Sequence, residues 1–286
     1  MKKKVILLAA MFVGATAFGQ DLTSKKGETM LPEAGDWAVQ FDAAPLFQYA
    51  GSIFSGDSLF APGATWVNTG TIAGKYFKDA STAYRVKLNI GMGSVTSKGL
   101  VSDQAAIFAD PTSTDMVEDT RKDGYTNITI GAGMEMRRGN GRLQGFYGSE
   151  LMFMIGSTKT TYTYGNEYDP QGNTHGITSY TNGADGMTVN GVETKSGTTI
   201  GLGVRGFVGC EYFVAAKISI GAEYGWGLGL SSTGNGSNTT KQVNSGGTAM
   251  EDNVTESAGS GAFGIGADIN GGNNLGTASL VATFHF

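Results

Sequence analysis

The sequence predicts an all-β protein, a closed antiparallel transmembrane β-barrel of eight strands, with ten as the alternative count. Apolar side chains alternate with polar or small ones over segments of about ten residues, as in strands that meet lipid on one face. Short connections alternate with long polar ones along the chain. The 46 glycines, and the lack of an apolar run of about 20 residues after the export leader, argue against a helical membrane protein.

Residues 1–19 have the pattern of a secretory signal peptide. Three lysines precede the apolar run Val5–Val13, and small residues up to Gly19 provide two contexts for cleavage. The apolar run is too short to cross a bilayer as a helix. No lipid-attachment cysteine follows it, because the only cysteine is Cys210. We therefore expect a signal peptide over 1–19 and one barrel domain over 20–286.

Five candidate strands occupy the first half of the exported chain. Trp37–Ala43 and Ile72–Phe77 show the alternation weakly. Tyr84–Gly93 shows it best, with five apolar residues on one face and two basic residues, an asparagine and two glycines on the other. Ile128–Arg137 repeats that pattern, and Leu143–Ile155 is a weaker version. Soluble amphipathic strands are rarely so long, so one face of each strand is expected to meet lipid.

Three further candidate strands follow in the second half. Ile200–Gly209 and Lys217–Leu228 place apolar residues on one face and mainly glycine with charged residues on the other. Ala278–Phe286 closes the chain with apolar residues at every second position. Strand-like residues also occur at Ala262–Asp268, which leaves the number of strands open between eight and ten.

The connections between these segments fall into two alternating classes. Three are short, namely Lys78–Ser81, Gly139–Gly141 and Glu211–Phe213. Four are long and rich in Gly, Asn, Ser, Thr and Asp, namely Ala44–Asn68, Ser97–Lys122, Thr163–Gly197 and Ser231–Gly276. Short periplasmic turns, long outer loops and an even strand count are typical of bacterial outer-membrane barrels. This order places both chain termini in the periplasm.

Aromatic residues predict the same topology, because Trp and Tyr favour the two membrane interfaces. One group falls at the expected periplasmic ends of the strands: Trp37, Tyr76, Tyr84, Tyr147, Phe284 and Phe286. A second group falls towards the expected outer ends: Tyr125, Tyr224 and Trp226. We therefore expect two aromatic girdles.

Three segments carry a resemblance to a known class of proteins. They are the leader end Ala17-Phe18-Gly19-Gln20, the opening strand Gly35-Asp36-Trp37-Ala38-Val39 and the chain end Phe284-His285-Phe286. The chain resembles the outer-membrane β-barrel proteins of Bacteroidota, and in architecture is similar to small OmpA- and OmpX-type barrels. The resemblance implies that Phe284 and Phe286 act as the signal read by the barrel-assembly machinery. It carries no motif specific to one activity.

The strands point a set of charged residues of both signs towards the expected barrel interior. These are Asp42, Lys75, Arg85, Lys87, Glu135, Arg137, Glu150, Arg205, Lys217, Glu223 and His285. The interior of an eight-stranded barrel is just wide enough to be filled by side chains. Unpaired buried charge is costly, so we expect a network of ion pairs that plugs the lumen. A narrow or gated ion pathway is the alternative.

Little in the sequence indicates catalysis. His175 with Asp169 and Ser179 is a formal candidate for lipid-modifying chemistry, although a lone loop histidine is usually solvated. We expect no catalytic residues, no cofactor and no metal site with characteristic spacing. The segment Asp57-Ser58-Leu59 resembles a short O-glycosylation signal used in Bacteroidota, a match that arises readily by chance. Cys210 is most simply a small buried residue.

Charge narrows the set of partners. Removal of the leader takes away three lysines, which leaves 17 Lys and Arg against 25 Asp and Glu, a net charge of −8. This balance argues against nucleic acid. Acidic outer loops could hold divalent cations that bridge to lipopolysaccharide. We expect a non-catalytic outer-membrane anchor or interaction protein that contacts lipid, lipopolysaccharide or another membrane protein. The alternative is a narrow passive pore for ions or very small solutes.

Overall fold

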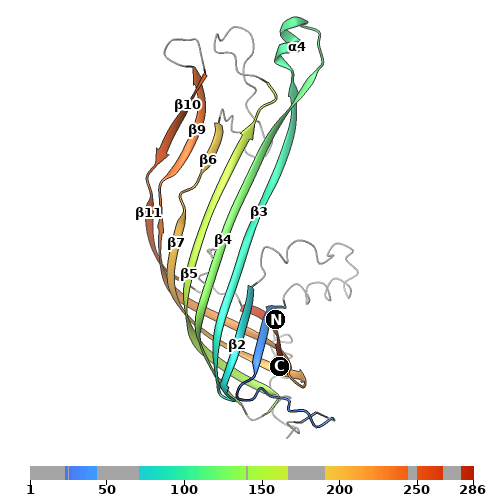
Figure 1. The fold of residues 1–286 in the computed structure, drawn as a ribbon, viewed down its shortest axis with the longest axis vertical. Helices are drawn as coiled ribbons and strands as arrows, with labels where there is room; N and C mark the ends of the chain where they lie inside the picture. Colours follow the sequence, from blue (N-terminus) through green and yellow to red (C-terminus); the bar gives the residue numbers. More distant parts are fainter. Residues whose placement is uncertain are drawn as a thin grey trace, which may run out of the picture.

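A computed structural model describes residues 23–24, 26–43, 71–139, 141–166, 191–243, 250–266 and 278–286. These residues form an antiparallel sheet of 12 strands and one short helix (Figure 1). The predicted all-β fold is confirmed. The leader at 1–19, the Asp57 segment and His175 with Asp169 and Ser179 lie outside the described residues.

The strand bounds are as follows: β1 Trp37–Asp42, β2 Thr71–Asp79, β3 Thr82–Ser102, β4 Met116–Arg138, β5 Leu143–Thr163, β6 Gly191–Lys195, β7 Thr199–Ala215, β8 Ile218–Thr233, β9 Gly236–Val243, β10 Met250–Ser257, β11 Ser260–Gly266 and β12 Ala278–His285. The helix α4 spans Gln104–Ala109. Eight strands pair in a closed ring, in the order β1, β2, β3, β4, β5, β7, β8 and β12. The count of described strands therefore exceeds both predicted numbers, while the ring itself has eight.

The ring closes with a stagger of ten residues. Directly paired residues lead once around it, in the order Ile220, Ala282, Phe41, Ile72, Leu88, Ile130, Phe153, Leu202 and Leu230. The row thus returns to β8 at Leu230, ten positions after Ile220. A closed ring of strands needs such a stagger, and the stagger tilts the strands relative to the ring axis.

Each strand of the ring has two chemically different faces. Strand β3 alternates between exposed apolar residues such as Val86 and Leu88 and buried polar residues such as Arg85 and Asn89. This arrangement reverses that of a soluble sheet, whose buried face is apolar. Among the described residues, the buried apolar cluster contains only Ala38, Phe77 and Ala83. The interior of the ring is therefore mainly polar, and its exterior is apolar.

Strands β3, β4 and β5 run the length of the molecule, whereas β1, β2 and β12 are short (Figure 1). The parts of the long strands beyond Gly93, Tyr125 and Gly156, together with α4, β6, β9 and β10, form what we call the sheet extension. Of the segments expected as long loops, Ser231–Gly276 is therefore largely strand in its described part, and Ser97–Lys122 is strand over half of its length. Many Thr and Val residues here favour extended backbone even without an apolar alternation.

Strand β11 shows whether the strand-like segment Ala262–Asp268 adds a strand to the ring. The end of that segment, residues 267–268, lies outside the described residues. Ser260–Gly266 is a strand that pairs with Thr233–Gly227 of β8. The next strand, β12, pairs with the neighbouring part of β8, Tyr224–Ile218. Both run antiparallel to β8, so β11 and β12 lie end to end along one edge. Strand β11 therefore adds no strand to the ring.

The turns match the sequence prediction in two cases and differ in one. The turns between β2 and β3 and between β4 and β5 lie where short connections were expected. The third prediction, a turn at Glu211–Phe213, is wrong because β7 continues to Ala215. The chain reverses at Ala216 and Lys217, and Lys217 has a φ of 60°, in the left-handed region.

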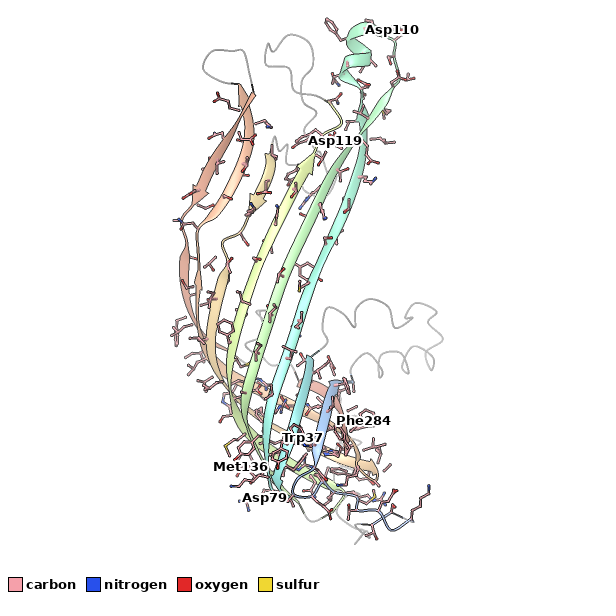
Figure 2. The ribbon with its side chains drawn as sticks, in the orientation of Figure 1. Trp37, Asp79, Asp110, Asp119, Met136 and Phe284 are labelled. Carbon is pink, nitrogen blue, oxygen red and sulfur yellow. The ribbon has the colours of Figure 1, made fainter. Side chains whose placement is uncertain are left out.

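One predicted aromatic girdle has clear counterparts in the structure. Trp37 and Tyr76 are paired across β1 and β2 with ring centroids 5.0 Å apart, and Tyr76 lies opposite Tyr84 on β3. Figure 2 shows Trp37 and Phe284 near this end of the ring, with Asp110 and Asp119 far away in the sheet extension. These aromatic residues are exposed on the exterior.

The second predicted girdle is wrong for Tyr125, which lies on the interior face. The Tyr125 side chain packs on Gly93, which lies on the face of β3 opposite to the exposed Met92. Tyr224 and Trp226 do face the exterior, but exposed Leu228 and Leu230 follow them on the same face. The apolar exterior therefore continues past this aromatic pair.

Candidate functional site

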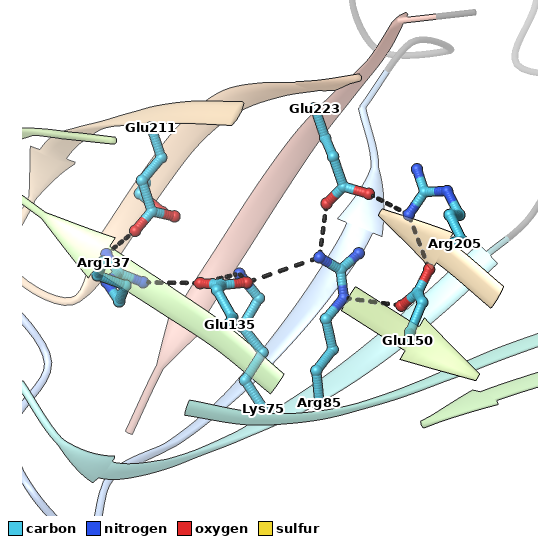
Figure 3. A network of polar contacts seen from close by, with 9 residues as sticks. Lys75, Arg85, Glu135, Arg137, Glu150, Arg205, Glu211 and Glu223 are labelled. Carbon is cyan, nitrogen blue, oxygen red and sulfur yellow. Dashed lines mark hydrogen bonds and ion pairs between the residues drawn. The ribbon is translucent and has the colours of Figure 1, made fainter. Parts of the chain in front are cut away.

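The main polar feature of the described residues is a cluster of eight charged side chains inside the ring (Figure 3). It consists of Lys75 on β2, Arg85 on β3, Glu135 and Arg137 on β4, Glu150 on β5, Arg205 and Glu211 on β7, and Glu223 on β8. Each of these residues is at most 3% exposed. Four are cations and four are carboxylates, so the cluster, which we call the interior network, carries no net charge.

Arg85 lies at the centre of the interior network. Its Nη1 donates a hydrogen bond of 2.6 Å to Oε2 of Glu223. The same guanidinium lies 3.6 Å from a carboxylate oxygen of Glu135 and 3.8 Å from one of Glu150. Arg205 completes this half by contacting Glu150 at 2.7 Å and Glu223 at 2.9 Å. Two arginines are thus held by carboxylates from three different strands.

The other half of the interior network lies around Glu135. Lys75 contacts this carboxylate at 2.7 Å, and Arg137 contacts it at 3.4 Å. Arg137 also forms an ion pair with Glu211. The hydroxyl of Ser219 donates a hydrogen bond of 3.0 Å to the second oxygen of Glu211. Ion pairs therefore connect β2, β3, β4, β5, β7 and β8 around the interior.

Aromatic rings fill the space beside the cations. The guanidinium of Arg85 lies 4.6 Å from the ring centroid of Phe207, and the ammonium of Lys75 lies 5.0 Å from that of Phe146. The two rings are themselves 6.3 Å apart. A cation over an aromatic face is attracted by the ring quadrupole, and the attraction is stronger when water is excluded.

A second aromatic group closes the interior at the end where β1 begins and β12 ends. Arg137 lies 5.2 Å from the ring of Phe77 and 5.8 Å from that of Phe213. The His285 ring contacts both phenylalanines, with centroids 5.4 and 5.2 Å away. Phe77 and Phe213 are fully buried, so bulky side chains obstruct this end of the ring.

Glycines make room for the large charged side chains. A Cβ atom added at Gly225 would overlap the guanidinium of Arg205, and one added at Gly133 would overlap the backbone of Ser149 and Glu150. Both glycines lie on the interior face of their strand. Gly225 is two residues from Glu223 on β8, and Gly133 is two residues from Glu135 on β4. The glycine content of the interior faces therefore follows partly from packing arginines into a narrow ring.

Pairing within the interior network offsets a large desolvation cost. Moving one charged side chain from water into the protein interior costs several kcal/mol, even after the protein has relaxed around it. Ion pairing offsets that cost only where the paired groups are well aligned and each buried cation has a buried carboxylate partner. Removing a single partner would leave an uncompensated buried charge, which typically destabilises by about 3–5 kcal/mol.

Seven of the eleven interior residues proposed from the sequence lie in the interior network, and an eighth, His285, is buried beside it against Phe77 and Phe213. Asp42 is half-buried at the last position of β1, and Lys87 is half-buried two residues beyond Arg85 on the same face of β3. Lys217 lies elsewhere, at the turn between β7 and β8, where it pairs with Asp36. The structure therefore does not bring Lys217 into the network.

Glu211 belongs to the interior network and was missed because it was placed in a turn. The signal was present in the sequence. Gly209, Glu211 and Phe213 continue the interior face of β7, while Val208, Tyr212 and Val214 continue the exterior face. Unbroken alternation through Val214 would have located the turn correctly.

Phe284 and Phe286, the proposed assembly signal, lie on the exterior at the chain end. Phe284 packs edge-on against Phe41, with ring centroids 6.3 Å apart. The backbone N–H of Phe286 donates to the carbonyl of Trp37 at 2.8 Å, and the reciprocal bond measures 2.9 Å. The last residue is therefore anchored to β1 while both aromatic side chains are exposed.

The described residues contain no group of three or more His, Cys, Asp or Glu arranged to hold a metal ion. Within the same ranges, no helix has the length and apolar character needed to cross a membrane. Cys210 is half-buried and lies on the exterior face of β7, between Val208 and Tyr212.

The fold and the site define the chain as an all-β protein whose ring of eight antiparallel strands encloses a charge-balanced network of buried ion pairs. No model of a known protein family matches the chain, and no curated protein is significantly similar to it. The functional interpretation therefore depends on the structure itself.

Proposed function

We propose that this protein is a transmembrane β-barrel of an outer membrane that acts as a non-catalytic anchor or interaction protein. The observation that carries this proposal is the interior network. Four cations and four carboxylates fill the ring, and bulky Phe77, Phe213 and His285 lie beside them at one end. A neutral interior occupied by charged and aromatic side chains suits a protein that presents surfaces more than one that conducts solutes.

The exterior of the ring supports a membrane location. On β3 the apolar exterior runs from Tyr84 to Met92, and on β8 it runs from Ile218 to Leu230. At about 3.3 Å per residue and a strand tilt of about 40°, ten residues rise about 25 Å. That height equals the apolar band of outer-membrane barrels. Exposed apolar surface on this scale is rare on soluble monomers.

The ring geometry supports a closed interior. Eight strands with a moderate stagger give a barrel just wide enough for side chains to fill. The buried arginines and phenylalanines are side chains of the size needed. We infer that the plugged form is the resting structure of the protein.

The sheet extension supports the anchoring role. Strands β9 and β10 carry mainly Ser, Thr, Asn and charged residues, and the described side chains of β10 are all exposed. With the chain termini in the periplasm, this polar sheet stands outside the cell, where it could contact a neighbouring protein or the cell-surface glycolipid. Surface segments on a rigid scaffold commonly carry binding functions.

Planar-bilayer recording of the refolded protein tests the proposal. We expect no steady single-channel steps from the wild-type protein at neutral pH, with protection of the ring from protease as the control for insertion. Steady conductance from the inserted wild-type protein would contradict the closed interior and favour the alternative, a narrow passive pore for ions or very small solutes.

A further inference from the structure

Four lysines lie on the exterior face of the sheet extension. They are Lys98 on β3, Lys122 on β4, Lys159 on β5 and Lys195 on β6. All four are exposed, and each shares the exterior face of its strand or of the strand paired with it. We call this group the lysine row.

Strand register brings the members of the lysine row together. Lys159 and Lys195 are directly opposite each other in the β5–β6 pairing. Lys122 lies opposite Thr161, two residues from Lys159, and Lys98 lies opposite Thr120, two residues from Lys122. Diagonal neighbours of this kind are about 7–8 Å apart, within reach of long side chains. The row therefore crosses four adjacent strands.

The lysine row follows the apolar exterior at a similar interval on each long strand. The last exposed or half-exposed aliphatic residues of that band are Met92 on β3, Ile128 on β4 and Ile155 on β5. The lysine lies six positions beyond Met92, six positions beyond Ile128 and four beyond Ile155. With the strand tilt given above, these intervals place the lysine backbones roughly 10–15 Å past the apolar band.

Two glutamates neutralise part of this charge. Glu118 contacts Lys98 at 2.8 Å, and Glu193 contacts Lys159 at 2.6 Å and Lys195 at 2.5 Å. Hydrogen bonds from Lys159 and Lys195 hold the pKa of Glu193 below its ordinary value, so it is ionised at neutral pH. The four lysines and the two glutamates together have a net charge of +2.

Glu118 and Glu193 offset the repulsion within the lysine row only in part. Like charges directly opposite in a sheet destabilise it, as Lys159 and Lys195 must do in part. The ion pairs that oppose this effect are exposed, and exposed pairs contribute little. Phosphate oxygens, which form strong charge-assisted hydrogen bonds with lysine, can displace them at small cost.

We propose that the lysine row binds the phosphate groups of an anionic glycolipid in the outer leaflet of the membrane. This inference rests on the proposed membrane location and adds a ligand to it. A lipid fits better than an acidic protein because the row follows the apolar band across the sheet, as the headgroup layer would.

The double variant K159Q/K195Q tests the inference against K26Q/K78Q, which removes two exposed lysines outside the row. Each protein is reconstituted in phosphatidylcholine nanodiscs and titrated with diphosphorylated lipid A or with the same lipid lacking phosphates, and binding is counted by native mass spectrometry. We expect K159Q/K195Q to bind the diphosphorylated lipid roughly tenfold more weakly, and K26Q/K78Q to match the wild-type protein.

The outcomes separate this inference from the proposed function. Equal affinity of K159Q/K195Q and the wild-type protein, or equal binding of the lipid without phosphates, would overturn the lysine row as a phosphate site. Failure of all three proteins to enter nanodiscs would instead contradict the membrane location. Binding should also weaken as salt increases, because exposed charges are screened within about 8 Å at 0.15 M.

Discussion

Arg85 and Glu223 join opposite sides of the ring, with Nη1 and Oε2 2.6 Å apart although 138 positions separate the two residues in sequence. Strands β3 and β8 are four steps apart in the ring of eight, so this contact crosses the interior. A charge pair in this position closes the space between two walls. It also couples the N-terminal and C-terminal halves of the chain.

Loss of Glu223 should destabilise the fold strongly. The substitution Glu223→Ala leaves Arg85 and Arg205 buried with one carboxylate fewer, and we expect a loss of about 3–5 kcal/mol. Glu118→Ala is the matched control, because Glu118 pairs with Lys98 at an exposed site and should cost less than about 1 kcal/mol. Urea unfolding in lipid vesicles measures both. Similar losses for the two variants would show that the interior network is not what stabilises the ring.

A side chain at position 225 should also destabilise the protein. In Gly225→Val the new side chain overlaps the guanidinium of Arg205, and overpacking of this kind typically costs about 1–3 kcal/mol. In the control Gly264→Val, on β11, no atom lies within 4 Å of the added Cβ. We expect that variant to fold as well as the wild-type protein by the same urea assay. Equal tolerance at both positions would be inconsistent with a filled interior.

The turn at Lys217 gives a prediction that concerns the backbone alone. Lys217 has a φ of 60°, where glycine is more favourable than other residues by about 1–2 kcal/mol. Both Lys217→Ala and Lys217→Gly lose the ion pair with Asp36. The glycine variant should therefore be the more stable of the two by about 1 kcal/mol in thermal or urea unfolding. Greater stability of the alanine variant would argue against this turn geometry.

The alternation of side chains predicts which residues point into the ring. It does not predict which cation forms an ion pair with which carboxylate. Seven residues of the interior network follow from period-two patterns within single strands, because alternate residues of a strand share a face. Whether Arg85 meets Glu223 or another carboxylate depends on the ten-residue stagger. That stagger is a property of the whole ring, and no single segment of sequence encodes it.

The sheet extension was not predicted because neither of its faces carries apolar residues at regular alternate positions. Strands in the ring are recognised by an apolar face, and Thr158–Thr163 has none. The lysine row was missed for a related reason. Lys98, Lys122 and Lys195 lie in segments interpreted as acidic loops, and Lys159 lies just beyond a predicted strand. Only the pairing of β3, β4, β5 and β6 places the four lysines on one surface.

Two equally exposed leucines provide the most direct test of the central claim, that the ring lies in a bilayer. Leu151 is 67% exposed on the apolar exterior of β5, and Leu100 is 68% exposed on the sheet extension. The measurement is the folding free energy in lipid vesicles of Leu151→Lys and Leu100→Lys. We predict a loss of about 2–4 kcal/mol for Leu151→Lys and almost none for Leu100→Lys, since only the first lysine faces lipid. Equal and small losses for both, as expected of two surface positions in water, would contradict the account.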